Sequence, residues 1–238
     1  MPEQILLCVP GPWADAVELG RAIASTAFGY ELAGGLLVKT ETRQAFPTQL
    51  QGPDPKLVGL FQSGGQGRMP KEALDEIGAH RTVLYVLCDG RSPEHAKAML
   101  DVGRALVAAG GLGVKVETSG KALSAAAWER CAPGGPGDLY WAFVVLVGQV
   151  QGMHISCGMH HFNLPDVAVP GDVHQYEAAD LMDRFNLYRM TQNPPLRSGA
   201  TFSLNDDAPK YLLRLVESAF PANDPFHNPH GEWHLAHA

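Results

Sequence analysis

The sequence predicts an α+β protein: a first half built from a duplicated βαβ unit in a ferredoxin-like arrangement, and a smaller α+β second half packed on it. The main observation is an internal repeat, because the windows Ala33–Thr42 (AGGLLVKTET) and Ala109–Thr118 (AGGLGVKVET) differ at only two positions. A weaker match precedes each window in the same order, at Glu18–Ile23 and Asp101–Leu106. Third, a Pro/Gly-rich segment at residues 132–137 separates two differently patterned parts of the chain. Ordered repeats of this kind indicate two copies of one supersecondary unit.

The first copy begins with a short aliphatic run, Ile5–Val9, which predicts a buried strand. Apolar residues at helical spacing in Trp13–Thr26 predict an amphipathic helix. The Gly pair of the first window is expected to end that helical segment, and Leu36–Thr40 to continue as a strand. Compared with the second copy, this one carries an insertion at residues 27–32.

The second copy follows the same order of elements. Thr82–Cys88 predicts an aliphatic strand, and Ser92-Pro93-Glu94 predicts the start of a helix that runs to about Ala109. Gly110-Gly111 ends this helix, and Leu112–Glu117 is the paired strand. The first half therefore comprises residues 1–131, with a long Gly-, Pro- and Gln-rich insertion at residues 43–79 that holds one or two short helices.

The second half is expected to comprise residues 138–238. Tyr140–Val147 and Met153–Met159 predict a hairpin, and Asp172–Tyr188 predicts a well-marked helix that begins at Asp172. The remaining elements are a short strand and a last helix, at Thr201–Leu204 and Pro209–Ala219.

Composition excludes several classes of function. The formal net charge is −7 and no cluster of Lys and Arg occurs, so no nucleic-acid partner is expected. No apolar run approaches the roughly 20 residues of a membrane span, and the first residues lack the features of a signal peptide. The four cysteines are scattered and form no CxxC pair, which favours a reducing compartment and hence a cytoplasmic location.

Histidine is concentrated in the second half, where eight of the ten lie after residue 150. Three of them, His154, His160 and His161, precede the predicted helix with Asp166 nearby. His174 and Glu177 share one helix face because they are three residues apart. A divalent metal held by such groups would support a metal-assisted hydrolase, although histidines and carboxylates are more often structural or solvated. The candidate residues are His154, His160, His161, Asp166, His174 and Glu177.

Cys157 lies three residues from both His154 and His160, a spacing that resembles metal ligation. If Met153–Met159 is a strand, however, its side chains alternate, and Cys157 points away from both histidines. A Cys/His zinc site is therefore not expected, and no metal is assigned to the chain.

Two further groups are candidates for binding. Gly65, Gly67 and Arg68 could present backbone amides and a guanidinium group to an anion, although the segment matches no known phosphate loop and a flexible surface loop is the favoured interpretation. Lys39 and Lys115 are related by the repeat and would lie on the sheet face opposite the helices.

The C-terminal histidines invite a further metal interpretation, which the sequence disfavours. Pro225 and Pro229 prevent a helix that would align the rings of His227, His230 and His234. Trp233 and Leu235 instead predict that the last strand docks onto the core.

Several segments together resemble an uncharacterised bacterial family, a domain of unknown function whose members end in an Asn-Pro-x-Gly-x-Trp segment. They are Gly158-Met159-His160, Leu164-Pro165-Asp166, Phe185-Asn186-Leu187-Tyr188, Gly199-Ala200-Thr201-Phe202-Ser203 and residues 228–235 (NPHGEWHL). The resemblance covers most of the chain and implies no known activity, so it transfers no catalytic role.

The function expected from these observations is that of a cytoplasmic binding protein, which engages a small molecule or another protein in a groove between the two halves. The alternative is the metal-assisted hydrolase, which requires at least three of its candidate groups to converge on one concave site. A structural partner in a larger assembly is a third possibility and would present a broad apolar surface. Catalytic residues and oligomeric state stay unassigned.

Overall fold

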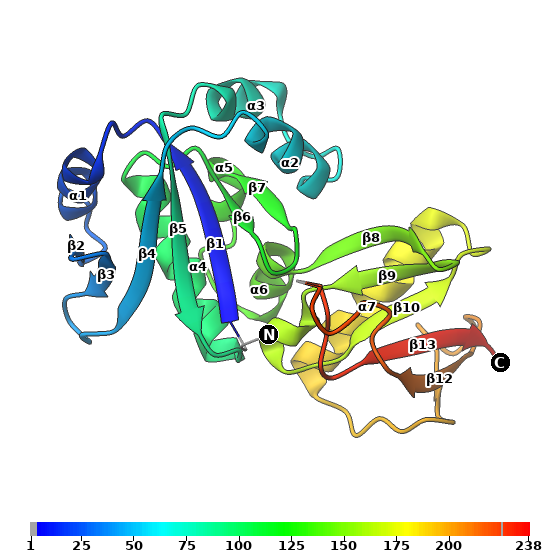
Figure 1. Cartoon of the computed structure of the whole chain (residues 1–238). Helices are drawn as coiled ribbons and strands as arrows, with labels where there is room; N and C mark the ends of the chain where they lie inside the picture. Colours follow the sequence, from blue (N-terminus) through cyan, green and yellow to red (C-terminus); the bar gives the residue numbers. More distant parts are fainter. Residues whose placement is uncertain (1–3, 225) are drawn as a thin grey trace. The chain divides into compact units, whose positions relative to one another are not determined.

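The computed structural model describes residues 4–224 and 226–238 and shows a mixed α and β protein (Figure 1). The chain divides into two compact units between Gly134 and Gly135, inside the Pro/Gly-rich segment. We call them the N-terminal unit and the C-terminal unit, and each contains one sheet. Within the described residues, no helix has both the length and the apolar character needed to cross a membrane. Residue Pro225, in the predicted turn region of the tail, lies outside the described residues.

The N-terminal unit is built on a seven-stranded sheet in the order β2-β3-β4-β5-β1-β6-β7, in which all neighbours are antiparallel. Its centre is the long pair β1 and β5, in register from Gln4 opposite Asp89 to Gly11 opposite Thr82. The strands are β1 Gln4–Gly11, β2 Tyr30–Ala33, β3 Leu36–Lys39, β4 Ala45–Gln51, β5 Thr82–Asp89, β6 Gly113–Val116 and β7 Ala122–Ser124.

Strand β1 is buried on both faces, which explains its uninterrupted aliphatic run. Cys8 packs with Leu57 and Phe61 of α2 and with Ile77 of α3, while α4 also contacts β1 (Figure 1). Strands covered on both sides lose the alternation of apolar and polar residues. The helices are α1 Ala16–Ala24, α2 Leu57–Gly64, α3 Lys71–Gly78, α4 Pro93–Ala108 and α5 Ala125–Glu129.

Helices α1 and α4 of this unit begin at residues whose side chains cap them. The Asp15 carboxylate accepts hydrogen bonds from the backbone N–H groups of Val17 and Glu18 at the start of α1. The Ser92 hydroxyl accepts from the backbone N–H of His95, and Pro93 occupies the first turn of α4. Side-chain acceptors at this position satisfy backbone donors that have no partner within the helix.

The two repeat windows adopt different local structures, contrary to the expectation of equivalent copies. In the first, Gly34 and Gly35 form the two-residue turn of the β2–β3 hairpin, with φ of 58° and 79°. In the second, Ala109 ends helix α4, Gly110 has φ of 99°, and β6 follows. Glycine adopts left-handed backbone conformations both in a hairpin turn and after a helix end. The repeated Gly pair is therefore compatible with both structures and does not determine which one forms. In a ferredoxin-like sheet the strand Leu36–Thr40 would lie beside β5. The neighbours of β5 are instead β4 and β1.

The C-terminal unit is built on a six-stranded sheet in the order β11-β12-β13-β10-β9-β8. The neighbours β10 and β13 are parallel, and the other pairs are antiparallel. Its elements are α6 Pro136–Phe143, β8 Val145–Val150, β9 Met153–Cys157, the 3-10 helix η1 Met159–Phe162, β10 Asp166–Pro170, α7 Gln175–Gln192, β11 Thr201–Phe202, β12 Tyr211–Val216 and β13 Glu232–His237.

Helix α7 packs against this sheet and closes its core (Figure 1). Leu181 and Phe185 of α7 pack with Val167 of β10 and with Trp233 and Leu235 of β13. The C-terminal strand is therefore docked through the two side chains that the sequence indicates. Terminal segments with buried anchors of this kind are held in place.

Three elements of the C-terminal unit differ from the sequence-based expectation. Tyr140–Val147 begins as helix α6, and strand β8 starts only at Val145. Pro209–Ala219, expected as a helix, contains strand β12, because pairing with β13 along six residues overrides its local helical pattern. Met153–Met159 is a strand only as far as Cys157.

Candidate functional site

The carboxylate of Asp166, at the start of β10, is the centre of a buried polar cluster in the C-terminal unit. Asp166 is only 2% exposed. Oδ1 accepts hydrogen bonds from the Met159 backbone N–H at 3.1 Å and from the Ser156 hydroxyl at 3.4 Å. Oδ2 accepts from the Asn228 side-chain amide at 2.7 Å. Donors from three separate segments thus orient one buried carboxylate, as a buried charge requires.

Helix α7 extends this cluster with two polar side chains on its buried face. The Asn186 amide donates to the Ser156 hydroxyl at 3.1 Å. Arg189 donates from Nη1 to the Asn186 side-chain oxygen at 3.2 Å and to the Pro165 carbonyl at 2.8 Å. Burial lowers the pKa of Arg189 to about 10, and the nearby Asp166 charge opposes that shift. Buried networks of this kind rigidify the segments that they join.

Cys157, His160 and Asp166 come together at this cluster, all three buried. One ligand atom of each lies within 4.8 Å of the others, and His160 Nδ1 is 4.0 Å from Asp166 Oδ2. No other group of three or more potential ligand residues of this kind occurs among residues 4–224 and 226–238. The predicted separation of Cys157 from His160 is therefore wrong.

The reason lies in Gly158, which follows the last residue of β9. Its φ of 125° turns the chain out of the strand and into η1, so side-chain alternation stops before His160. A Cβ at this position would lie 2.3 Å from the carbonyl oxygen of Phe143, so only glycine fits.

The other predicted ligands do not join this group. His154 stays on β9, with Nε2 3.1 Å from the Val173 carbonyl oxygen. His161 stacks beside His160, with ring centroids 4.1 Å apart, and meets the edge of Phe143. The proposed set of six hydrolase residues is thus divided.

His174 and Glu177 line a separate surface pocket of about 570 Å³, near the start of α7. His174 occupies the N-cap position of α7, not a position inside the helix as the predicted start at Asp172 implied. The pocket is bounded by Asp172, Val173, His174, Glu177, Asp180, Leu181, Leu204, Pro209, Tyr211 and His237.

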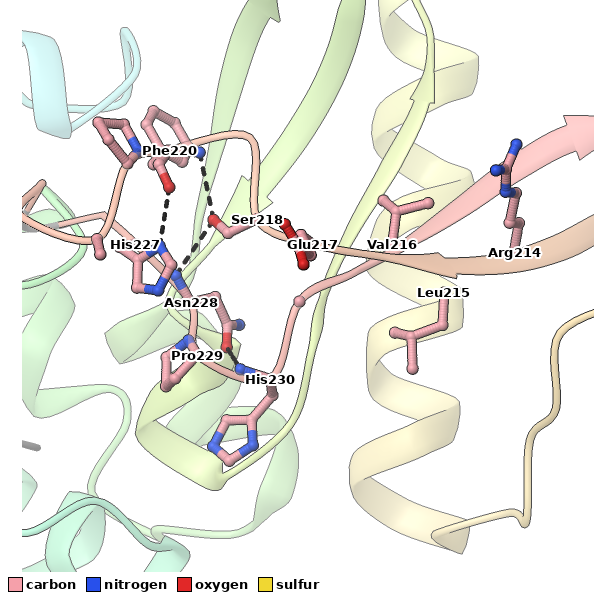
Figure 2. A pocket seen from close by; sticks show the side chains of 13 residues that line it. Arg214, Leu215, Val216, Glu217, Ser218, Phe220, His227, Asn228, Pro229 and His230 are labelled. Atoms are coloured by element: carbon pink, nitrogen blue, oxygen red, sulfur yellow. Dashed lines mark hydrogen bonds between the residues drawn. The ribbon is translucent and has the colours of Figure 1, made fainter.

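A larger pocket, of about 870 Å³, is formed where β12 and β13 are joined by residues 217–224 and 226–231, here called the C-terminal loop (Figure 2). Arg214, His227 and His230 line it together with one carboxylate, that of Glu217. The remaining lining residues are Leu215, Val216, Ser218, Phe220, Pro221, Ala222, Asn228, Pro229 and Gly231.

Hydrogen bonds within the C-terminal loop hold this pocket open. His227 Nδ1 lies 2.8 Å from the Phe220 carbonyl oxygen, and the Ser218 hydroxyl accepts from the backbone N–H groups of Phe220 and Asn228 (Figure 2). The Asn228 side-chain oxygen accepts from the His230 backbone N–H at 2.9 Å. The pocket is therefore defined by its own loop before any ligand binds.

Gly231 and Asn228 connect the loop to the core. Gly231 has φ of 80°, and a Cβ there would lie 2.2 Å from the Val216 carbonyl oxygen, so the chain turns into β13 only with glycine. Asn228 is 1% exposed and reaches inward to Asp166 and to the Leu164 carbonyl oxygen. The pocket wall and the Asp166 cluster thus share a residue.

The candidates in the N-terminal unit do not form one site. Lys39 donates from Nζ to the Phe28 carbonyl at 2.7 Å and lies over the Tyr30 ring. Lys115 is buried and paired with Glu117. Three strands, β4, β5 and β1, separate their strands β3 and β6 in the sheet, so the repeat does not place these lysines side by side.

The anion candidate at Gly65, Gly67 and Arg68 forms a compact turn. The backbone N–H groups of Gly65 and Arg68 donate to the carbonyl oxygens of Phe61 and Gly65 within the same turn. These amides are therefore directed into the protein, and an anion would have to rely on the remaining groups of the loop.

Sequence reasoning did not assign roles to Ser156, Asn186, Arg189 or Asn228. A signal for two of them exists in α7, whose buried positions run Ala178, Leu181, Met182, Phe185, Asn186 and Arg189. This is the spacing of one helix face, so the two polar residues fall on a core-facing stripe. Buried polar residues on such a stripe indicate a network.

Comparison of the chain with protein-family models, with curated proteins and with solved structures found no match. The resemblance to a family of unknown function therefore stays a prediction. Its quoted segments contribute His160, Asp166, Asn186 and Asn228 to the buried cluster.

Proposed function

We propose that this protein binds a small organic anion in the pocket of the C-terminal loop. The observation that carries the proposal is the pocket itself: a volume of about 870 Å³, within the range of roughly 300–1,000 Å³ usual for small-molecule sites, formed by a loop that hydrogen bonds already hold in place. When a ligand binds to a pre-formed site, little free energy is spent on ordering the loop. The groove between the halves stays a prediction.

The lining favours a negative ligand with an apolar body. Arg214 carries a permanent positive charge, and His227 and His230 add two imidazoles against the single carboxylate of Glu217. Because the Phe220 carbonyl oxygen can only accept, His227 Nδ1 carries the proton of this bond, and Nε2 can donate to an anionic ligand only in the imidazolium form. Phe220 and Val216 supply apolar surface. Carboxylates and phosphates on short carbon skeletons match this combination.

Binding experiments with defined compounds test the proposal. Succinate, benzoate and inorganic phosphate would be titrated into the ¹⁵N-labelled full chain, with putrescine as a cationic control. We expect at least one anion to shift the backbone resonances of Phe220, His227 and His230, and putrescine to leave them unchanged. Equal responses to putrescine and to the anions would contradict the proposal.

A matched pair of variants locates the site. Arg214→Gln removes a pocket charge from an exposed position, and Arg197→Gln removes an exposed charge outside the pocket lining of the same unit. Loss of one charge-assisted hydrogen bond weakens binding by about 1.5–3 kcal/mol, or about tenfold or more. Calorimetry should show that loss for Arg214→Gln alone. The same dissociation constant in both variants would remove Arg214 from the site.

The metal-assisted hydrolase stays the alternative, with less support. Its candidate residues divide between the buried cluster and the pocket of His174 and Glu177. A hydrolytic site needs a substrate beside the ion, and Cys157, His160 and Asp166 are all buried.

We also infer that the N-terminal unit follows the ferredoxin-like plan. Adjacent antiparallel strands β4-β5-β1-β6, with α1 after β1 and α4 after β5, support this inference. The paired units would then be β1-α1-β4 and β5-α4-β6, with the β2–β3 hairpin and helices α2 and α3 as insertions. A cytoplasmic location stays our proposal and is supported by four buried cysteine thiols.

A further inference from the structure

We propose that Cys157, His160 and Asp166 bind a divalent transition-metal ion of the zinc class inside the C-terminal unit. These residues supply one sulfur, one nitrogen and one oxygen, all within 4.8 Å of one another. Thiolate, imidazole and carboxylate are the ligands that zinc takes in proteins. The proposal is independent of ligand binding in the loop pocket.

The distance between His160 and Asp166 is nearer to that between two zinc ligands than to a direct hydrogen bond, and the Cys157 thiol, which donates to the Phe226 carbonyl oxygen at 3.8 Å, would give up that bond to the ion. In a tetrahedral zinc site, bond lengths of about 2.0–2.3 Å place neighbouring ligand atoms about 3.3–3.6 Å apart. His160 Nδ1 and Asp166 Oδ2 are 4.0 Å apart, which is too long for a hydrogen bond and about 0.7 Å longer than the spacing of a nitrogen and an oxygen ligand. Side-chain shifts would bring these three ligands to that spacing, and a tetrahedral ion would take a water molecule as its fourth ligand.

The surroundings orient the ligands as the supporting residues of a metal site do. Met159 and Ser156 hold Asp166 Oδ1, and Asn228 donates to Oδ2. A carboxylate oxygen has two lone pairs, so Oδ2 can accept from Asn228 and still bind an ion. Hydrogen bonds to ligating groups fix their orientation and raise affinity.

The charges of the ligands are compatible with a divalent ion. Cys157 would bind as a thiolate and release its proton to solvent, and Asp166 would bind as a carboxylate. Together they carry two negative charges, which one divalent cation neutralises. The positive charge of Arg189 is directed to the Pro165 carbonyl and the Asn186 side-chain oxygen, so it does not take the place of the ion between the three ligands.

The position of the ligands indicates a structural ion. Cys157 ends β9, His160 lies in η1, and Asp166 begins β10, so the ion would tie both ends of the turn between two neighbouring strands (Figure 1). All three side chains are buried, and the ion would be out of reach of substrates. Closed sites of this kind contribute to folding stability.

Metal analysis of the untagged full chain, purified without chelator, tests the proposal directly. We expect about one zinc ion per chain, and a lower melting temperature after removal of the metal with a chelator. Addition of Co²⁺ to the metal-free chain should then produce the near-ultraviolet charge-transfer absorption of a thiolate bound to cobalt. This absorption requires a cysteine ligand, so a metal held only by surface histidines would not produce it.

Three variants complete the test. Cys157→Ser should abolish the cobalt–thiolate absorption, whereas Cys131→Ser, which removes a buried thiol from the N-terminal unit, should retain it. Asp166→Asn should weaken zinc binding at least tenfold. A wild-type chain that takes up neither zinc nor cobalt would overturn the proposal without any variant, and so would a cobalt–thiolate band that persists in Cys157→Ser.

Discussion

The side-chain amide of Asn228 donates a hydrogen bond of 2.7 Å to the Asp166 carboxylate, across a separation of 62 residues in sequence. The same amide donates to the Leu164 carbonyl oxygen, and its oxygen accepts from the His230 backbone N–H. One buried side chain thus fastens the loop that forms the pocket to the strand that carries the candidate metal ligand.

We therefore expect Asn228→Leu to destabilise the C-terminal unit by about 3 kcal/mol, because it leaves the buried Asp166 carboxylate without one of its donors. Urea unfolding of the full chain, followed by circular dichroism, measures the change. Asn223→Leu is the matched control, because Asn223 is an exposed residue of the same loop. Equal midpoints for the two variants would show that the Asn228 contacts add no stability.

Local patterns of the sequence predicted much of the secondary structure. Ile5–Val9, Thr82–Cys88 and the helix that begins at Ser92-Pro93 follow from aliphatic runs and capping residues, which act within a few positions. The strand at Tyr211–Val216 did not follow, because its partner β13 lies about twenty residues further along the chain. Pairing over that separation leaves no local signal.

The repeat misled the sequence interpretation for a related reason. The Gly pair at Gly34-Gly35 forms a hairpin turn, and that at Gly110-Gly111 follows a helix end. Both the hairpin turn and the helix end need a residue with left-handed backbone, so the sequence of the Gly pair does not distinguish the two structures. The candidate site shows the same limit: a single glycine, Gly158, ends strand β9 and brings His160 to Cys157.

The close approach of α4 and α5 at Gly103 gives a second prediction. A Cβ on Gly103 would lie 2.5 Å from the Trp128 indole nitrogen, which donates to the Leu100 carbonyl. We expect Gly103→Ala to destabilise the N-terminal unit by about 1–3 kcal/mol through overpacking, despite the higher helix propensity of alanine.

Gly59 of α2 is its control, because a Cβ there meets nothing within 4 Å. Gly59→Ala should stabilise the same unit by about 0.5–1 kcal/mol. Thermal unfolding of both variants decides the point, since a gain in stability from Gly103→Ala would contradict the packing against Trp128.

The buried thiols of the N-terminal sheet should resist alkylation. Burial, followed by the charge of Asp89, raises the pKa of Cys88 to about 11, and burial together with the charge of Glu117 raises the pKa of Cys8 further. Only the thiolate reacts, so the native chain should not react with iodoacetamide at these two positions at pH 8. Peptide mass spectrometry should find both labelled only in urea. Native labelling at the rate seen in urea would contradict this.

The stability of the C-terminal unit should fall at alkaline pH because of Tyr140. Its hydroxyl donates to Asp183 Oδ1 at 2.6 Å, and burial, then the Asp183 charge, raises its pKa well above the usual value of 10. The unfolded chain therefore loses this proton at lower pH than the folded chain. The contribution of Tyr140 is complete below about pH 10 and decreases as pH rises above it, by about 1.4 kcal/mol per pH unit.

Unfolding curves of the wild type and of Tyr140→Phe between pH 8 and 11 measure this contribution. At pH 8 we expect Tyr140→Phe to be less stable, because it lacks the hydrogen bond to a charged acceptor. The difference in unfolding free energy between the two proteins should then shrink above pH 10, because only the wild type loses the contribution of the Tyr140 hydroxyl. Tyr176→Phe is the control, because Tyr176 is 74% exposed, and it should keep the wild-type slope. A pH-independent gap between wild type and Tyr140→Phe would show that the Tyr140 hydroxyl ionises alike in both states.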